Sequence, residues 1–202
     1  MKKLLLTSGG LGNPKIGEKF LGLVDKPASE IKVLFIPTAS RSEEDILYID
    51  KSRKELINLG ILDENINSFN FDRELTDEEK NNIDAVYVCG GNTFYLLHKV
   101  RESGFDEVLK RLIDKGVVYV GVSAGSIILG PDIELTATPD PNDINLQDTK
   151  GLGLVDAALS PHYCKEEEEI VKEWSSKADY EILPLTDNQA LLVTDDKTEI
   201  IE

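Results

Sequence analysis

Apolar runs of strand length alternate with helical patterns over the first two thirds of the chain. The apolar runs are continuous, as expected for strands of a parallel sheet whose two faces are both covered. They lie near residues 2–7, 31–39, 85–91 and 117–123. Helical patterns occupy residues 42–60, 76–83, 92–104 and 105–116, and three of these four end at a glycine. This alternation predicts an α/β fold, with a doubly wound, mostly parallel sheet and helices on both faces.

The pattern changes after about residue 130. Residues 131–153 contain three prolines and little periodicity, so we expect a long irregular segment or a hairpin with a loop. A further strand is predicted at 157–163 and a helix at 165–177. Strand-like runs within 180–202, separated by turn residues, predict an antiparallel hairpin at the sheet edge. Because no repeat or linker interrupts the chain, we expect a single domain over residues 1–202.

Composition excludes several classes of protein. No apolar run reaches the ~18 residues of a membrane span, and the apolar run in MKKLLLTSGG stops at three leucines, too short for a secretory signal. A net charge of −16 argues against nucleic-acid binding. The presence of only two cysteines and two histidines argues against a structural zinc site. We therefore expect a cytoplasmic protein without a metal, a nucleic-acid partner or a membrane partner.

One hydroxyl interrupts the apolar stretch VVYVGVSAGSIILG at residues 117–130. Ser123 lies where the predicted strand ends and a helix can begin, in the pattern Gly-x-Ser-Ala-Gly. Small neighbours allow a sharp strand-to-helix turn, which raises a serine hydroxyl as a nucleophile elbow. The same pattern also fits a tight turn without chemistry, so a partner base has to be found.

The choice of base is narrow, because the chain contains only His98 and His162. His98 lies in a helical pattern, where an exposed or half-buried histidine is ordinary. His162 follows a predicted strand and is preceded by Pro161. If that strand runs parallel to the others, His162 lies at the same sheet edge as Ser123 and can act as its base.

A third, orienting carboxylate cannot be selected from 38 acidic residues by composition. Asp140 in the irregular segment fits the order serine, acid, histidine. Asp187, in the turn LTDNQA, fits the order serine, histidine, acid. Both stay open on the residues alone.

A glycine pair follows the strand near residues 85–91. Gly90 and Gly91 precede Asn92, at the predicted start of a helix. The backbone N–H of Gly91 could form one half of an oxyanion hole, with the N–H of Ala124 as the other half. A Gly-Gly turn capped by Asn92 is the alternative.

The motifs CGGNTFYLL, GVSAGS and SPHY, in this order and spacing, resemble those of peptidase family S51, which includes aspartyl dipeptidase (peptidase E) and cyanophycinase. The resemblance covers most of the chain. It implies a fold similar to class I glutamine amidotransferases (flavodoxin-like), with a serine in place of their elbow cysteine. It implies Ser123 as nucleophile, His162 as base, an acid near Asp187, and oxyanion N–H groups from Gly91 and Ala124. The dipeptidase branch has glutamate where Asp187 stands.

The resemblance also implies a serine peptidase that acts on small peptides through an acyl-enzyme, without a cofactor, as a monomer or homodimer. In the aspartyl dipeptidases an arginine follows the histidine and pairs with the substrate aspartate. This chain has Lys165 and four glutamates there, so a preference for aspartate does not carry over. Arg41, at a predicted strand end, is another candidate for contact with a substrate carboxylate. Two alternatives stay open: a cyanophycinase-like hydrolase of β-linked peptides, and a non-catalytic amidotransferase-like binding protein.

Overall fold

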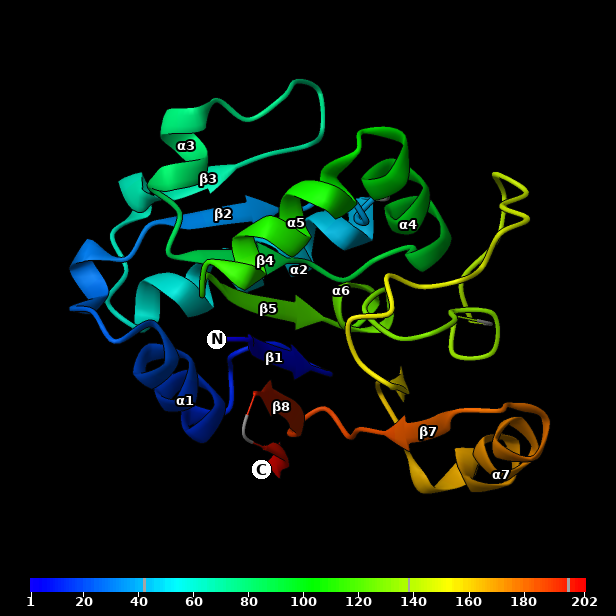
Figure 1. The fold of residues 1–202 in the computed structure, drawn as a ribbon. Helices are drawn as coiled ribbons and strands as arrows, with labels where there is room; N and C mark the ends of the chain where they lie inside the picture. Colours follow the sequence, from blue (N-terminus) through cyan, green and yellow to red (C-terminus); the bar gives the residue numbers. More distant parts are fainter. Residues whose placement is uncertain (42, 138, 196) are drawn as a thin grey trace.

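The computed structural model describes residues 1–41, 43–137, 139–195 and 197–202. Its centre is a seven-stranded sheet with the strand order β3-β2-β4-β5-β1-β8-β9 (Figure 1). The first five strands in this order are parallel, and β8 and β9 are antiparallel to their neighbours. The strands of this sheet are β1 (Lys3–Thr7), β2 (Val33–Ile36), β3 (Ile66–Ser68), β4 (Ala85–Val88), β5 (Val118–Val122), β8 (Ala190–Thr194) and β9 (Thr198–Ile201). The predicted mostly parallel sheet is confirmed.

Helices cover both faces of this sheet, which also confirms the sequence-based prediction. Helices α1 and α2 pack on one face, and α4, α5 and α6 pack on the other (Figure 1). The short helix α3 follows β3 and has no buried residue. The helices are α1 (Pro14–Val24), α2 (Glu43–Asn58), α3 (Asp77–Asn81), α4 (Thr93–Glu102), α5 (Phe105–Asp114), α6 (Ala124–Ile127) and α7 (Glu168–Lys177), with short 3-10 turns at Ala28–Glu30, Asp63–Asn65 and Lys165–Glu167.

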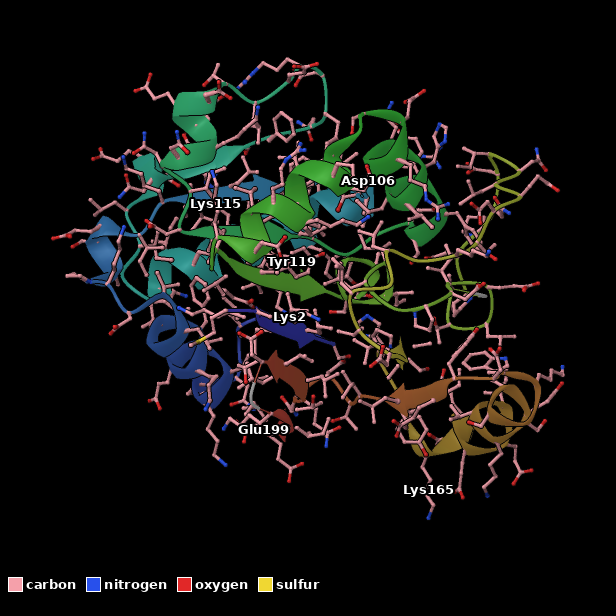
Figure 2. All side chains as sticks on the ribbon, viewed as in Figure 1. Lys2, Asp106, Lys115, Tyr119, Lys165 and Glu199 are labelled. Carbon is pink, nitrogen blue, oxygen red and sulfur yellow. The ribbon has the colours of Figure 1, made fainter. Side chains whose placement is uncertain are left out.

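The continuous apolar runs are explained by two separate cores. Successive side chains of a strand point to opposite faces, so each apolar strand contributes to both cores. In β1, Leu4 and Leu6 pack with α4, α5 and α6, whereas Leu5 packs with α1 and α2. Tyr119 of β5 is fully buried and lies near the middle of the sheet (Figure 2). The main force that holds these layers together is burial of apolar surface, which contributes a free energy of about 25 cal/mol per Å².

The C-terminal third differs from the expectation in one respect. The strand predicted at 157–163 forms β6 (Ala157–Ser160), which does not join the main sheet. It pairs in parallel with β7 (Glu181–Pro184) in a separate two-stranded sheet, and α7 connects the two strands (Figure 1). The predicted antiparallel hairpin is formed by β8 and β9 alone, and β8 pairs with β1.

The segment between α6 and β6 is irregular, as its prolines and missing periodicity predict. An isolated antiparallel bridge joins Asp132 to Lys150 and closes this segment into a long loop. Within the described ranges, every helix is too short or too polar to span a bilayer.

Candidate active site

Three parallel strands end at the same edge of the sheet, and a polar or glycine-rich turn follows each of them. Thr7 of β1 is in register with Val122 of β5, and Val88 of β4 is in register with Gly121. Ser8, Gly90 and Ser123 come directly after these strand ends or one residue later. Open parallel sheets bind their ligands at this edge, beyond the carboxyl ends of the strands.

Ser123 occupies a strained turn between β5 and α6. Its backbone has φ 48° and ψ −109°, a conformation that non-glycine residues rarely adopt. The turn is closed by hydrogen bonds from the N–H groups of Ser126 and Ile127 to the Ser123 carbonyl, and by one from the Ser123 N–H to the Thr7 carbonyl. The strain is of the order of 1–3 kcal/mol and is maintained by the surrounding fold. This geometry matches the elbow predicted from the sequence.

The glycines of the elbow motif are required by close backbone contacts. A Cβ atom on Gly121 would lie 2.6 Å from the carbonyl oxygen of Gly125. A Cβ atom on Gly125 would lie 2.4 Å from the carbonyl oxygen of Val88. Both distances are far below van der Waals contact, so the turn can pack between β4 and β5 only with glycine at these positions.

The imidazole of His162 lies between Ser123 and Asp187. Its Nε2 atom is 2.9 Å from Ser123 Oγ, and its Nδ1 atom is 2.6 Å from Asp187 Oδ1. With Nδ1 protonated and donating to the carboxylate, Nε2 can accept the proton of the serine hydroxyl. The side chains of His162 and Asp187 are 56% and 68% exposed, so substrate can reach them from solvent.

The route that brings His162 to Ser123 differs from the expectation. The sequence analysis relied on a strand parallel to the others in the main sheet, and β6 belongs to the small sheet instead. His162 follows β6 in a left-handed conformation with φ 61°, which turns the chain toward the main sheet. The N–H of Tyr163 then donates to the Leu185 carbonyl, so the loop after β6 is tied to the chain that leaves β7.

Ser8 is a site residue that the sequence analysis did not select. Its side chain is fully buried, and its hydroxyl oxygen accepts the backbone N–H of His162 at 2.7 Å. The same hydroxyl donates to Asp187 Oδ1 at 3.2 Å. A signal was available in the sequence, because Ser8 opens a Ser-Gly-Gly turn at the end of the first strand, as Gly90 and Gly91 do at the end of β4.

Asp140 lies at a different place from Asp187. Its Oδ2 atom accepts the N–H of Thr93 at 2.8 Å, at the start of α4. A carboxylate in this position satisfies a free helix N–H and interacts favourably with the helix dipole. Asp140 therefore anchors the irregular loop to α4, while Asp187 contacts the imidazole of His162.

The other polar candidates lie away from the imidazole. Arg41 pairs with Asp143 at 2.9 Å and stacks over the ring of Tyr95. His98 faces Glu102 on α4 at 3.8 Å. Lys165 opens the 3-10 turn before α7 and lies on the outer side of the small sheet, where the run of glutamates continues into the first turn of α7 (Figure 2).

Gly90 and Gly91 lie beside the elbow. A Cβ atom on Gly90 would be 3.2 Å from Ser123 Cβ, so the two turns touch. Gly91 has φ 132°, and a Cβ atom there would lie 2.3 Å from the Ala39 carbonyl oxygen.

The side chain of Asn92 caps α4 by accepting the N–H of Tyr95, as predicted by the alternative interpretation of this stretch as a capped Gly-Gly turn. Within the described residues, the N–H groups of Gly91 and Ala124 have no hydrogen-bond partner.

A cavity of about 530 Å³ opens in front of Ser123 and His162. Its walls come from the turns after β1, β4 and β5, from the turn at Asp187, and from one side of α2. Glu55 of α2 is nearly buried in this wall, and burial raises the pKa of its carboxyl group although the Leu11 N–H and Lys51 oppose the shift. A cavity of this size holds a small molecule or a short peptide.

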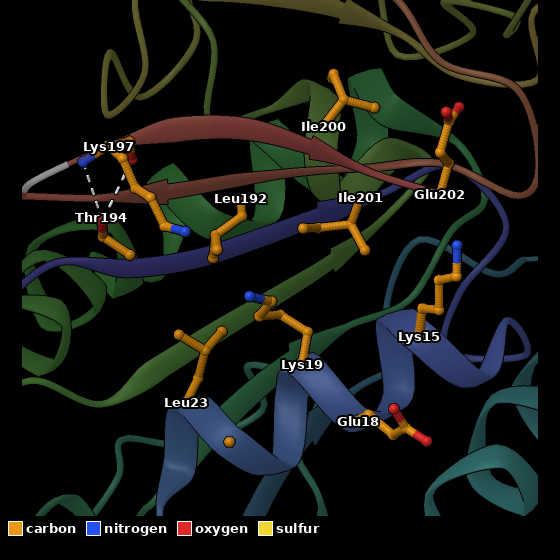
Figure 3. A pocket seen from close by; sticks show the side chains of 11 residues that line it. Lys15, Glu18, Lys19, Leu23, Leu192, Thr194, Lys197, Ile200, Ile201 and Glu202 are labelled. Carbon is orange, nitrogen blue, oxygen red and sulfur yellow. Dashed lines mark hydrogen bonds between the residues drawn. The ribbon is translucent and has the colours of Figure 1, made fainter.

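A second cavity of about 670 Å³ lies between α1 and the β8–β9 hairpin (Figure 3). Aliphatic side chains, among them Leu23 and Ile201, form its floor, and lysines such as Lys15 and Lys19 stand at its rim. None of the site residues predicted from the sequence lines it. Of the predicted site residues, Gly91, Ser123, His162 and Asp187 line the smaller cavity instead.

A doubly wound α/β fold with a serine elbow, a histidine and a carboxylate in contact defines a serine-type hydrolase. The chain belongs to peptidase family S51, whose family model matches residues 4–201. An uncharacterized peptidase of Listeria monocytogenes is 36% identical over 80% of this chain and 81% of its own length. One of Pasteurella multocida is 32% identical over 100% of this chain and 97% of its own length.

The fold is shared with a solved structure as well. A crystal structure described as that of a candidate peptidase E protein from Listeria monocytogenes superposes with a TM-score of 0.83 at 30% identity. The match covers 100% of this chain and 98% of that one. The resemblance seen in the sequence motifs is thus confirmed at the level of family and fold, and the protein is a peptidase of serine type.

Proposed function

We propose that this protein hydrolyses short peptides with Ser123 as nucleophile, His162 as general base and Asp187 as orienting acid, within a single domain over residues 1–202. The observation that carries the proposal is the position of one imidazole within hydrogen-bond distance of both a strained elbow serine and a carboxylate. A second observation supports it. The Gly91 and Ala124 N–H groups beside the elbow have no hydrogen-bond partner within the described residues, and Gly91 lines the cavity, so both are assigned as donors to the oxyanion.

The reaction proceeds in two stages. Ser123 Oγ attacks the carbonyl carbon of the peptide bond while His162 Nε2 takes the hydroxyl proton. The negative charge that develops on the carbonyl oxygen is stabilised by the N–H groups of Gly91 and Ala124. The C–N bond then breaks, Nε2 gives its proton to the leaving amine, and an acyl-enzyme remains. Water, deprotonated by the same imidazole, attacks the ester and releases the acid and the free serine.

Asp187 keeps the imidazole in the productive state. Its carboxylate accepts the Nδ1 proton, so that Nε2 is left unprotonated toward Ser123, and it stabilises the imidazolium after proton transfer. Asp140 is excluded from this role in the proposal because its carboxylate is used at the start of α4.

The size of the cavity supports a small substrate. About 530 Å³ is the volume of a few amino-acid residues, which favours a short peptide over a polymer. Lys165, the cation that follows His162, does not line this cavity. The proposal therefore assigns no aspartate preference to that position.

Ser123→Ala tests the proposal. Wild type is screened against a dipeptide library and against a β-linked polymer such as cyanophycin, and both proteins are treated with a fluorophosphonate. We expect wild type to hydrolyse dipeptides and to be labelled, and Ser123→Ala to do neither while keeping its far-UV circular dichroism spectrum. Full activity of Ser123→Ala would refute the mechanism, failure of wild type to label would indicate a binding protein, and hydrolysis of polymer alone would indicate a cyanophycinase-like enzyme.

A further inference from the structure

One side of helix α2 forms a wall of the catalytic cavity. Tyr48, Lys51, Ser52 and Glu55 all line the cavity. The last three follow Tyr48 by three, four and seven positions, which places all four on the same side of a helix. This wall lies in the cavity that contains Ser123 and His162, so it is within reach of a peptide that binds there.

The cavity lining carries more negative than positive side chains. Among the described residues that line the cavity, Lys51 carries the one permanent positive charge, while Glu55 and Asp187 carry carboxylates. Arg41, which pairs with Asp143, is absent from the lining. With a net charge of −16 on the whole chain, a substrate carboxylate needs a local cation in the cavity to be attracted there. Lys51 is that cation.

The ammonium group of Lys51 is exposed at the cavity. Its side chain is 59% exposed, and its Nζ atom forms a long ion pair with Glu55 Oε1 at 3.8 Å. Glu55 is held in place from the other side, because its Oε2 atom accepts the N–H of Leu11 at 2.8 Å. Lys51 therefore presents an exposed ammonium group beside a carboxylate that the chain itself holds in place.

We propose that Lys51 binds a free carboxylate of the peptide substrate, and that the enzyme therefore acts on short peptides with a carboxylate close to the scissile bond. This inference rests on the proposed peptidase function, and it names the group on the substrate that the cavity recognises. The carboxylate can come from the C-terminus of the peptide or from an acidic side chain. An ammonium–carboxylate contact forms charge-assisted hydrogen bonds in either case.

Protection of Ser123 against a fluorophosphonate tests the inference without a known substrate. Three probes are compared at equal ionic strength: N-acetyl-leucine, which has an α-carboxylate; N-acetyl-aspartic acid α-amide, which has a side-chain carboxylate; and N-acetyl-leucinamide, which has none. We expect at least one carboxylate probe to slow labelling of wild type more than the neutral amide does. The better carboxylate probe identifies the source of the carboxylate.

Variants of α2 separate Lys51 from general electrostatics. Lys51→Gln should weaken protection by the better carboxylate probe about tenfold, as expected for loss of one charge-assisted contact. Lys51→Arg should restore much of it. Lys54→Gln is the matched control, because Lys54 is an exposed lysine of the same helix that does not line the cavity, and it should behave as wild type.

The outcomes distinguish the two levels of the proposal. If wild type is labelled but carboxylate and amide probes protect equally, or if Lys51→Gln protects as well as wild type, the inference about Lys51 is overturned and the peptidase mechanism stands. An equal loss in Lys51→Gln and Lys54→Gln overturns it too, because it indicates a general charge effect. If wild type is not labelled at all, the proposed function itself fails and the inference fails with it.

Discussion

The backbone N–H of His162 donates to the hydroxyl oxygen of Ser8 across 154 positions of sequence, at 2.7 Å. The same hydroxyl donates to Asp187 Oδ1 at 3.2 Å, so one buried side chain contacts two of the three proposed catalytic residues. His162 has a left-handed backbone, which needs support from its surroundings. Ser8 supplies that support by accepting the His162 N–H, and its hydroxyl also contacts the carboxylate of Asp187.

Ser8→Ala should therefore reduce the rate of the chemical step more than substrate binding. We expect kcat to fall by about 10- to 100-fold, because the imidazole is less well oriented, while KM changes little. Steady-state kinetics on a dipeptide substrate measures both constants. Ser103→Ala, which removes a hydroxyl at the end of α4, is the control and should leave both constants unchanged. If Ser8→Ala changed KM alone, a positioning role for Ser8 would be contradicted.

The strain at Ser123 predicts that two inactive variants, Ser123→Gly and Ser123→Ala, differ in stability. Ser123→Gly should raise the melting temperature by about 2–4 °C, because glycine adopts φ 48° and ψ −109° without the cost of a Cβ atom. Ser123→Ala keeps the Cβ atom and the strain, and should melt close to wild type. Differential scanning calorimetry measures the difference. Equal melting temperatures for the two variants would show that the elbow is not strained.

The identity of the orienting acid is tested by two single substitutions. Asp187→Asn should lower kcat by about 10³- to 10⁴-fold, because an amide group facing Nδ1 favours the wrong imidazole tautomer. Asp140→Asn should keep most activity, because its amide oxygen can still accept the Thr93 N–H. Steady-state kinetics measures the activity of both variants, and melting curves check that both are folded. The opposite ranking of the two activities would assign the role to Asp140.

Glu55 gives the stability of the protein a dependence on pH. Burial raises the pKa of its carboxyl group in the folded state, so its protonated form is favoured by folding. Its contribution to stability is present below the pKa of the unfolded chain and is lost as the pH rises through the raised folded value. Glu55→Gln removes this cost and can still accept the Leu11 N–H. We expect the variant to melt about 1–3 °C above wild type at pH 8 and close to it at pH 4. The same difference at both pH values would disprove the effect.

Local patterns predicted much of the fold and part of the site. Continuous apolar runs indicated strands covered on both faces, since each residue such as Leu4 or Leu5 is buried whichever way it points. The elbow at Ser123 was predictable because its glycines and its position at a strand end are properties of a few adjacent residues. The scarcity of histidine then pointed to His162.

Only the tertiary structure decided which groups meet. The small β6–β7 sheet was not predicted, because the pairing of strands depends on long-range contacts that apolar content alone does not specify. Ser8 and Asp187 are 179 positions apart, and Asp140 and Asp187 look alike in sequence. A carboxylate becomes an orienting acid only through the backbone that carries it to an imidazole, and that backbone path is set by packing of the whole chain. By itself, the sequence determined the strand-to-helix turn at Ser123 and the sheet behind it, because both depend on local sterics and burial.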